Sequence, residues 1–195
     1  MKRAIATLCA TLLGSGVAMA QDRSPTEAAI DALSKVCQPA LESEIAPRLS
    51  AEKAGLNRDV APPPVVALKF PITKLGSASY SAPVAGGRVS VVSTVLPPPA
   101  SPFSCLISLD VDAPDLIERV REGWLKPGGR YQAQPGAADP ENKIDQLVLN
   151  AVDPTTGAID KIIAIRLRQP AENAMRAMIL TYRVNDDSMR AAGLK

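Results

Sequence analysis

The sequence predicts an α+β domain: a largely antiparallel β-sheet with an N-terminal helical segment and one central helix packed on one face. Two segments, near 24–54 and 112–124, space their apolar residues by three and four positions, as helices do. Most of the remaining chain alternates apolar and polar residues as strands do, and a five-residue turn joins two of these strands as a hairpin. No regular strand–helix–strand repeat is present, which disfavours a parallel sheet.

The N-terminal helical segment is predicted from its start signal and its apolar face. Residues 24–27 read Ser-Pro-Thr-Glu, a pattern with a capping Ser, a Pro at the first helical position and a Glu that completes a capping box. Pro39 is expected to kink or restart the helix, and a second piece is expected to run to Ala54, where Gly55 ends it. The apolar face comprises Ile30, Leu33, Cys37 and Leu41.

The predicted strands follow a proline-rich linker at residues 62–64. Their apolar residues alternate, which is the pattern of a strand with one buried face. The segments are a short run around Tyr80, residues 88–96, a strand with Cys105, Ile107 and Leu109 on one face, the hairpin strands 147–152 and 159–167, and a last strand with Met178, Leu180, Tyr182 and Val184 on one face.

The central helix is expected to open at Asp112, with Asp115 in its first turn, where the helix dipole favours an anion. Ile117, Val120 and Trp124 then share one apolar face. Residues 127–129 read Pro-Gly-Gly and are expected to end the helix.

Residues 1–20 have the features of a cleaved secretory signal. A basic start at Lys2 and Arg3 precedes a short apolar run, and Ala18 to Ala20 match the small-x-small pattern of a cleavage site after Ala20. We therefore expect a periplasmic or secreted bacterial protein with no transmembrane segment after cleavage. Residues 21–64 and 65–184 are expected to form one domain, with a polar tail at 185–195.

Charge composition argues against nucleic acid as a partner. The chain has 22 Lys and Arg and 20 Asp and Glu, and the surplus comes from Lys2 and Arg3, which the predicted cleavage removes. A mature chain without net positive charge lacks the basic surplus typical of nucleic-acid binding. Aromatic residues make up only 3% of the chain, so few side chains could stack on sugars or bases.

Cysteine and histidine content limits the chemistry. Cys9 lies in the predicted signal, and Cys37 and Cys105 are expected to form one structural disulfide in an oxidising compartment, where it would staple the first helix to the sheet. The chain contains no His, so a Ser-His-Asp or Cys-His site and a His-bearing zinc site cannot form within it. We predict no cofactor and no metal.

Candidate binding and catalytic residues are few. Arg166, Arg168, Arg176 and Arg183 could form a basic surface for an anionic partner, although the solvated face of a sheet carries such residues too. Ser50 and Lys53 fit the Ser-x-x-Lys spacing of some serine enzymes, and are equally an ordinary charged helix end. Two acidic groups, one around Asp110 to Asp115 and one around Asp139 to Asp145, lack the glycine and final Glu of an EF-hand loop.

These observations favour a non-catalytic binding or interaction module of the bacterial envelope, whose partner is an envelope protein or a small ligand. Such a module is expected to present an apolar patch or a sheet edge. The alternative is a small hydrolase that uses carboxylates or the Ser50 and Lys53 pair, and this alternative predicts a deep pocket with convergent ionisable groups.

Overall fold

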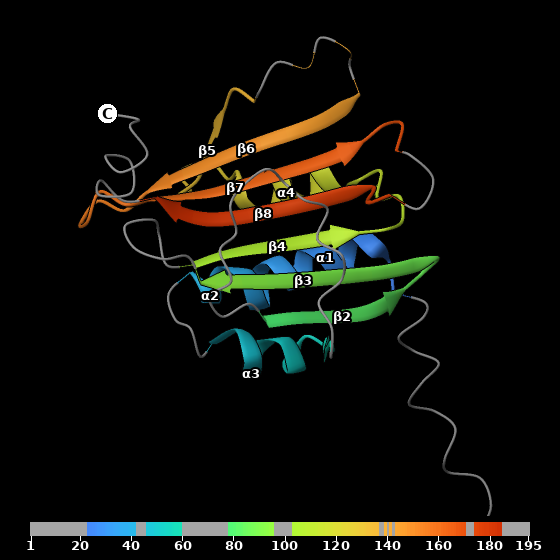
Figure 1. The fold of residues 1–195 in the computed structure, drawn as a ribbon. Coiled ribbons are helices and arrows are strands. Elements are labelled where there is room, and N and C mark those ends of the chain that lie inside the picture. Colours follow the sequence, from blue (N-terminus) through green and yellow to red (C-terminus); the bar gives the residue numbers. More distant parts are fainter. Residues whose placement is uncertain are drawn as a thin grey trace, which may run out of the picture.

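A computed structural model describes residues 23–41, 46–59, 78–95, 103–136, 139, 141, 143–170 and 174–184. The predicted signal peptide, the linker at 62–64 and the C-terminal tail lie outside these residues. Within them, one eight-stranded antiparallel sheet has the order β1-β2-β3-β4-β8-β7-β6-β5 (Figure 1). The predicted antiparallel sheet is therefore confirmed. Its strands are β1 (Asn57–Arg58), β2 (Ala78–Val84), β3 (Gly87–Val95), β4 (Phe103–Leu109), β5 (Gln132–Gln134), β6 (Ile144–Val152), β7 (Ile159–Leu167) and β8 (Ala177–Val184).

The sheet consists of two four-stranded meanders that meet at its centre. β1 to β4 pair in chain order, and so do β5 to β8. The two meanders join where β4 pairs with β8, in a register that sets Leu106 opposite Leu180. Each meander is preceded by helix, so the chain repeats one arrangement without a repeated sequence motif.

The N-terminal helical segment is confirmed, and it is continuous up to Leu41. α1 (Pro25–Ala32) passes into a π-helical turn, η2 (Leu33–Cys37), and then into α2 (Gln38–Ala40). In this turn the N–H of Gln38 donates to the carbonyl of Leu33, five residues back. Because Pro39 lacks an N–H and its ring crowds the preceding turn, a widened turn accommodates it without breaking the helix.

The predicted capping at Ser24 is wrong in its detail. The Ser24 side chain makes no capping hydrogen bond, although its carbonyl accepts from the N–H of Ala28. The Thr26 hydroxyl in the first turn of α1 donates a hydrogen bond to the carboxylate of Asp115, the N-cap residue of the helix Leu116–Trp124. This long-range contact links the first turn of α1 to Asp115 and caps neither helix.

The next two helices differ in how well their ends were predicted. α3 (Ala46–Lys53) ends as expected at Gly55, whose positive φ of 74° suits glycine. α4 (Leu116–Trp124) begins four residues after the predicted Asp112, with Asp115 as its N-cap. The Asp112 carboxylate instead accepts hydrogen bonds from Arg166 on β7.

The predicted hairpin is present, with β6 and β7 joined through residues 153–157. The Asp153 carboxylate accepts from the backbone N–H groups of Thr155 and Thr156, and Gly157 has a positive φ of 70°. These contacts are the ordinary chemistry of a tight turn, in which Asp closes the loop and Gly takes the left-handed conformation.

Among the described residues, one hydrophobic core combines buried residues of the helices with residues from one side of the strands. Cys37 and Cys105 form a disulfide inside it, which joins η2 to β4 at the centre of the sheet. Leu33 and Val36 of η2 are fully buried there, as is Val120 of α4. The strand residues of this core include Val89, Val91, Ile107, Leu149, Ile162 and Ile179.

We call this side of the sheet the helix-covered face, and the opposite side, where none of the described helices lies, the helix-free face. Side chains alternate between the two along every strand. On β7, Asp160, Ile162 and Ala164 are buried on the helix-covered face, whereas Lys161 and Ile163 are partly exposed on the other. Figure 1 shows α1 and α4 behind the strands, so the helix-free face is the one turned to the viewer.

Candidate binding surface

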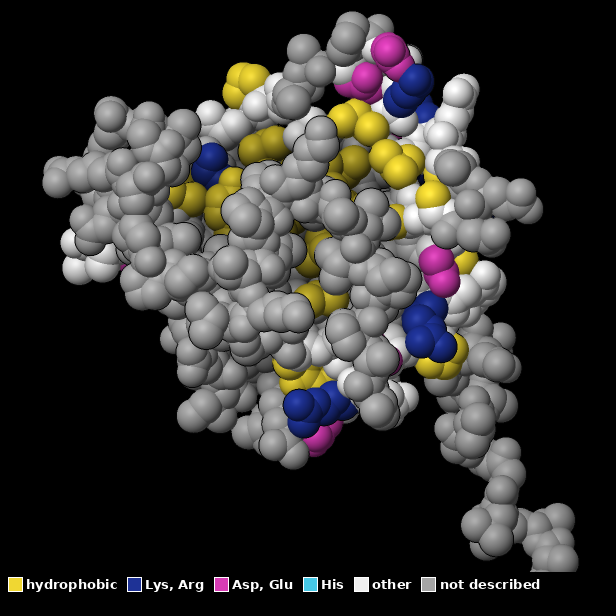
Figure 2. Space-filling view, viewed as in Figure 1, with side chains coloured by type: hydrophobic (Ala, Val, Ile, Leu, Met, Phe, Trp, Pro, Cys, Tyr) yellow, Lys and Arg dark blue, Asp and Glu magenta, His cyan; other side chains and the backbone are white. Residues whose placement is uncertain are grey.

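The helix-free face carries an apolar row that crosses five neighbouring strands. Strand register places its members side by side, and each is partly exposed. At about 4.8 Å between strands, the row spans roughly 19 Å. Figure 2 shows hydrophobic side chains over this part of the sheet. The row consists of Val92, Leu106, Leu180, Ile163 and Val148.

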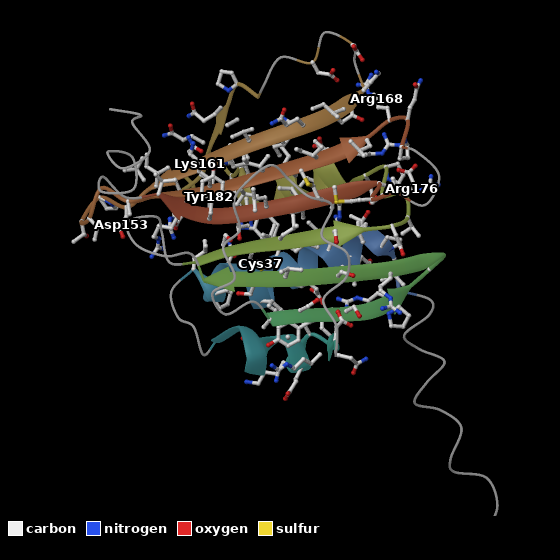
Figure 3. The ribbon with its side chains drawn as sticks, viewed as in Figure 1. Cys37, Asp153, Lys161, Arg168, Arg176 and Tyr182 are labelled. Atoms are coloured by element: carbon white, nitrogen blue, oxygen red, sulfur yellow. A yellow bond between two sulfur atoms is a disulfide. The ribbon has the colours of Figure 1, made fainter. Side chains whose placement is uncertain are left out.

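A polar row lies next to the apolar row, two residues further along the strands. Lys161 on β7 stands between Tyr182 on β8 and Asn150 on β6, and Figure 3 shows Lys161 and Tyr182 on their neighbouring strands. Lys161 is the only charged side chain that β6, β7 and β8 place on this face. Burial raises the pKa of the Tyr182 hydroxyl above its ordinary value. The row therefore combines a cation with neutral polar groups beside an apolar surface.

Two amides on this face have unsatisfied oxygens. The Asn150 Oδ1 and the Gln146 Oε1 are buried and accept no hydrogen bond from the residues that the structure describes. Both residues lie on β6, opposite Lys161 and Ile165 respectively. Unpaired buried acceptors are uncommon because each loses its hydration without compensation.

A second candidate is a buried carboxylate at the end of the β6–β7 hairpin, on the helix-covered side. Asp160 is 3% exposed, and Arg183 binds it with two hydrogen bonds, from Nε at 2.6 Å and from Nη2 at 3.1 Å. Arg130 donates to the same carboxylate and lies 5.8 Å from the ring centroid of Tyr131. Burial raises the pKa of the Tyr131 hydroxyl, while a hydrogen bond with Gln38 partly offsets this effect.

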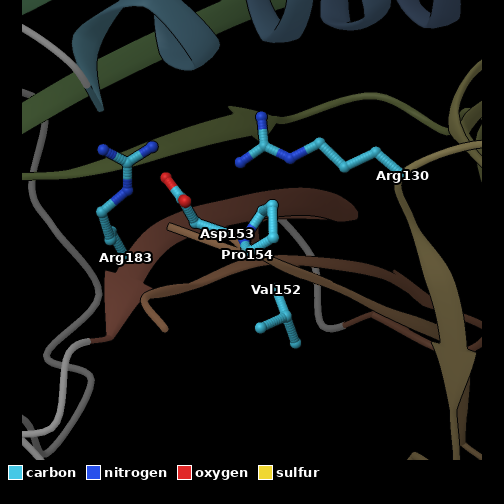
Figure 4. A pocket seen from close by; sticks show the side chains of 5 residues that line it. All are labelled: Arg130, Val152, Asp153, Pro154 and Arg183. Carbon is cyan, nitrogen blue, oxygen red and sulfur yellow. The ribbon is translucent and has the colours of Figure 1, made fainter. Parts of the chain in front are cut away.

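Two shallow hollows adjoin this Asp160 cluster, and both are lined by Arg130 and Arg183. One, of about 410 Å³, is completed by Val152, Asp153 and Pro154 and is drawn in Figure 4. The other, of about 290 Å³, lies between the cluster and η2 and α2. Each hollow has one carboxylate beside the two guanidinium groups, Asp153 in the first and Asp160 in the second, which offsets their positive charge in part. The remaining lining residues of the second hollow are Ser34, Gln38, Pro39, Leu41 and Tyr131.

A third cluster ties the start of α4 to the sheet. Arg166 donates to both oxygens of Asp112, at 3.0 and 3.1 Å, and to Asp145 at 3.1 Å. Arg168 Nε donates to Asp145 at 2.9 Å. Hydrogen bonds from Arg166 lower the pKa of Asp112, and those from Arg168 and Arg166 lower the pKa of Asp145. This cluster is a neutral, structural network of two arginines and two aspartates.

The four arginines predicted to form one basic surface fall into two places. Arg166, Arg168 and Arg176 lie near one end of β7 and β8, whereas Arg183 lies near the far end of β8 beside Asp160. Carboxylates accompany Arg166, Arg168 and Arg183. Binding of an anionic partner by these arginines stays a prediction, and their ion pairs reduce the charge available for it.

The catalytic alternatives gain no support from the placement of their residues. Ser50 is partly exposed and Lys53 is exposed on α3, and neither lines the two hollows described above. In the part of the chain that the structure describes, no group of three or more His, Cys, Asp or Glu residues is arranged to hold a metal ion. The Asp110 and Asp115 carboxylates accept instead from the Arg88 N–H and the Thr26 hydroxyl.

The sequence analysis did not predict that the helix-free face is apolar, although the sequence of β7 indicates it. Residues 159–167 read Ile-Asp-Lys-Ile-Ile-Ala-Ile-Arg-Leu, with apolar residues at adjacent positions. Strict alternation predicts one buried face, whereas a continuous apolar run indicates that both faces are apolar. A comparison of neighbouring positions on β7 and β8 could have located this surface.

No family model, curated protein or solved structure matches this chain. Within its described residues, no helix is both long enough and apolar enough to cross a membrane.

Proposed function

We propose that this protein is an exported, non-catalytic binding module of the bacterial envelope, and that its helix-free sheet face binds an apolar partner or ligand. The observation that carries the proposal is the apolar row from Val92 to Val148 across five strands. Export is supported by the signal-like residues 1–20 and by the disulfide between Cys37 and Cys105.

We take α1 and α4 to form one helical layer over the helix-covered face. α1 contacts β3 and β4, α4 contacts β6 and β7, and the two helices contact each other. With that face occupied by helices, the opposite face is the apolar surface that the described helices leave available for binding. Contiguous apolar patches on a protein surface commonly mark binding sites, because burying them on association is favourable.

Binding of the neutral fluorescent probe N-phenyl-1-naphthylamine tests this proposal. The wild type is expected to bind the probe, and Leu180→Glu is expected to weaken binding at least tenfold by placing a carboxylate in the middle of the apolar row. Burial of an unpaired carboxylate against a bound apolar molecule is strongly unfavourable. Ile163→Glu, one strand away, is expected to have the same effect, and circular dichroism confirms that both variants are folded.

Gly123→Glu is the matched control. It adds the same carboxylate to the exposed surface of α4, where a new Cβ meets nothing within 4 Å. Probe binding is expected to be unchanged in this variant. Failure of the wild type to bind the probe, or equal weakening in all three variants, would contradict the proposed surface.

A further inference from the structure

A continuous apolar strip runs away from Lys161 along the helix-free face. On β7, Ile163, Ile165 and Leu167 follow Lys161 at two-residue steps and are partly exposed. At about 3.4 Å per residue, the strip from Lys161 to Leu167 is roughly 20 Å long. Leu180 and Met178 of β8 pair with Ile163 and Ile165 and widen it on one side. The strip therefore has a cation at one end and an apolar path beyond it.

Among the described residues, the Lys161 ammonium and the hydroxyl of its neighbour Tyr182 have no ion-pair or hydrogen-bond partner. Lys161 makes no ion pair within the described residues, in contrast to the arginines of the two aspartate clusters. The Tyr182 hydroxyl makes no hydrogen bond there either, although burial raises its pKa. An ammonium group on a partly buried apolar surface gains most from an anion that accepts its hydrogen bonds.

An acyl chain fits the rest of the strip better than a peptide does. The strands that carry the strip, β7 and β8, are hydrogen-bonded to neighbours on both sides, so their backbones offer no free edge. A peptide laid across the apolar row would bury its own N–H and C=O groups without partners, at considerable cost. A hydrocarbon chain has no such groups, and its burial is favourable along its whole length.

From these observations we infer that the helix-free face binds a single-chain anionic amphiphile of the fatty-acid type. Its carboxylate accepts hydrogen bonds from the Lys161 ammonium and the Tyr182 hydroxyl, and its chain lies over Ile163 and Ile165. This inference rests on the proposed function, because it names the ligand class of the same apolar surface. Charge complementarity specifies the head group, and the length of the strip suits a medium or long chain.

Two twelve-carbon probes below their critical micelle concentrations separate the head group from the chain. Binding of anionic dodecanoate and of neutral dodecyl maltoside is measured by displacement of N-phenyl-1-naphthylamine. Lys161→Gln is expected to weaken dodecanoate about tenfold, the usual size of one charge-assisted hydrogen bond, and to leave dodecyl maltoside unchanged. Lys126→Gln, which removes an exposed lysine beyond the end of α4, is the matched control and is expected to change neither.

The outcomes distinguish the inference from the proposed function. If Leu180→Glu abolishes binding of dodecyl maltoside but Lys161→Gln leaves dodecanoate unchanged, the apolar surface stands and the anionic head group is wrong. If neither amphiphile binds the wild type or displaces the probe, the fatty-acid inference is wrong. If sedimentation shows a dimer that Leu180→Glu dissociates, a second copy of the chain occupies this face and the inference is overturned.

Discussion

The two faces of this sheet are made by the same strands, yet among the described residues only one of them is covered by helices. On the helix-covered face, Ile162 and Ile179 are fully buried, and the disulfide fixes η2 to β4. On the helix-free face, Ile163 and Leu180, one residue away, are partly exposed. The comparison shows that apolar content alone does not define a core, since a core also needs a layer to cover it.

Charged groups show the same contrast. On the helix-covered side, Asp160 is buried between Arg130 and Arg183, and Asp112 and Asp145 are paired with Arg166. On the helix-free side of β6, β7 and β8, Lys161 has no such partner in the described part of the chain. Complete pairing suits a structural role, whereas an unpaired charge beside an apolar surface suits recognition.

The largest expected effect on stability comes from removing the disulfide. The bond closes a separation of 68 residues, and the double substitution Cys37→Ala and Cys105→Ala is expected to lower the free energy of unfolding by about 4 kcal/mol in the chain-entropy model. Urea denaturation measures this loss. The folded variant is expected to bind N-phenyl-1-naphthylamine as the wild type does, because the disulfide lies on the helix-covered face. A loss below about 1 kcal/mol would show that the bond does not constrain the unfolded chain as this model assumes.

Adjacent isoleucines on β7 offer the closest comparison of the two faces. Ile162→Ala is expected to lower the free energy of unfolding by about 3 kcal/mol because it leaves a cavity in a fully buried site. Ile163→Ala is expected to cost about 1 kcal/mol because its side chain is partly exposed. Both lie within the same strand, so the loss of β propensity is similar in each. Equal costs in urea denaturation would mean that the helix-free face is as well packed as the core.

Acid sensitivity is the smallest expected effect. Hydrogen bonds from Arg166 and Arg168 lower the folded-state pKa values of Asp112 and Asp145. Their contribution to stability is therefore full above the unfolded value of about 3.9 and is lost as the pH falls through the lower folded values. Since Asp112 is half exposed, screening keeps the contribution below about 1 kcal/mol.

The variant Arg166→Gln tests this assignment, because it removes the donor shared by both carboxylates. Compared with the wild type, its free energy of unfolding is expected to be lower at about pH 7, and this deficit is expected to shrink toward about pH 2 as the aspartates become protonated. Urea denaturation at the two pH values measures the difference. A deficit that stays constant would assign the role of Arg166 to packing instead of charge.

Local patterns in the sequence predicted most of the secondary structure. Gly55 ends α3, and Asp153 and Gly157 form the turn between β6 and β7. The position of Cys105 on the buried face of β4 was also expected, because it alternates with Ile107 and Leu109. These features depend on residues close together in the chain, and short-range chemistry is enough to predict them.

The parts that were not predicted depend on contacts between distant segments. Asp112 was expected to open a helix, but Arg166, 54 residues away, binds it instead. Asp160 and Arg183 meet only because the register of β7 and β8 sets them opposite each other. The helix-free face was missed for the same reason, since an apolar run does not reveal which of its residues the helices cover.

Methyl NMR of the wild type, titrated with dodecyl maltoside below its critical micelle concentration, tests the central claim most directly. The account predicts that the methyl signals of Leu106, Ile163 and Leu180 shift with a common saturation curve, while those of Ile162 and Ile179 stay in place. Shifts confined to the methyl groups of the helix-covered face, or no shifts at all, would contradict a binding role for the helix-free face.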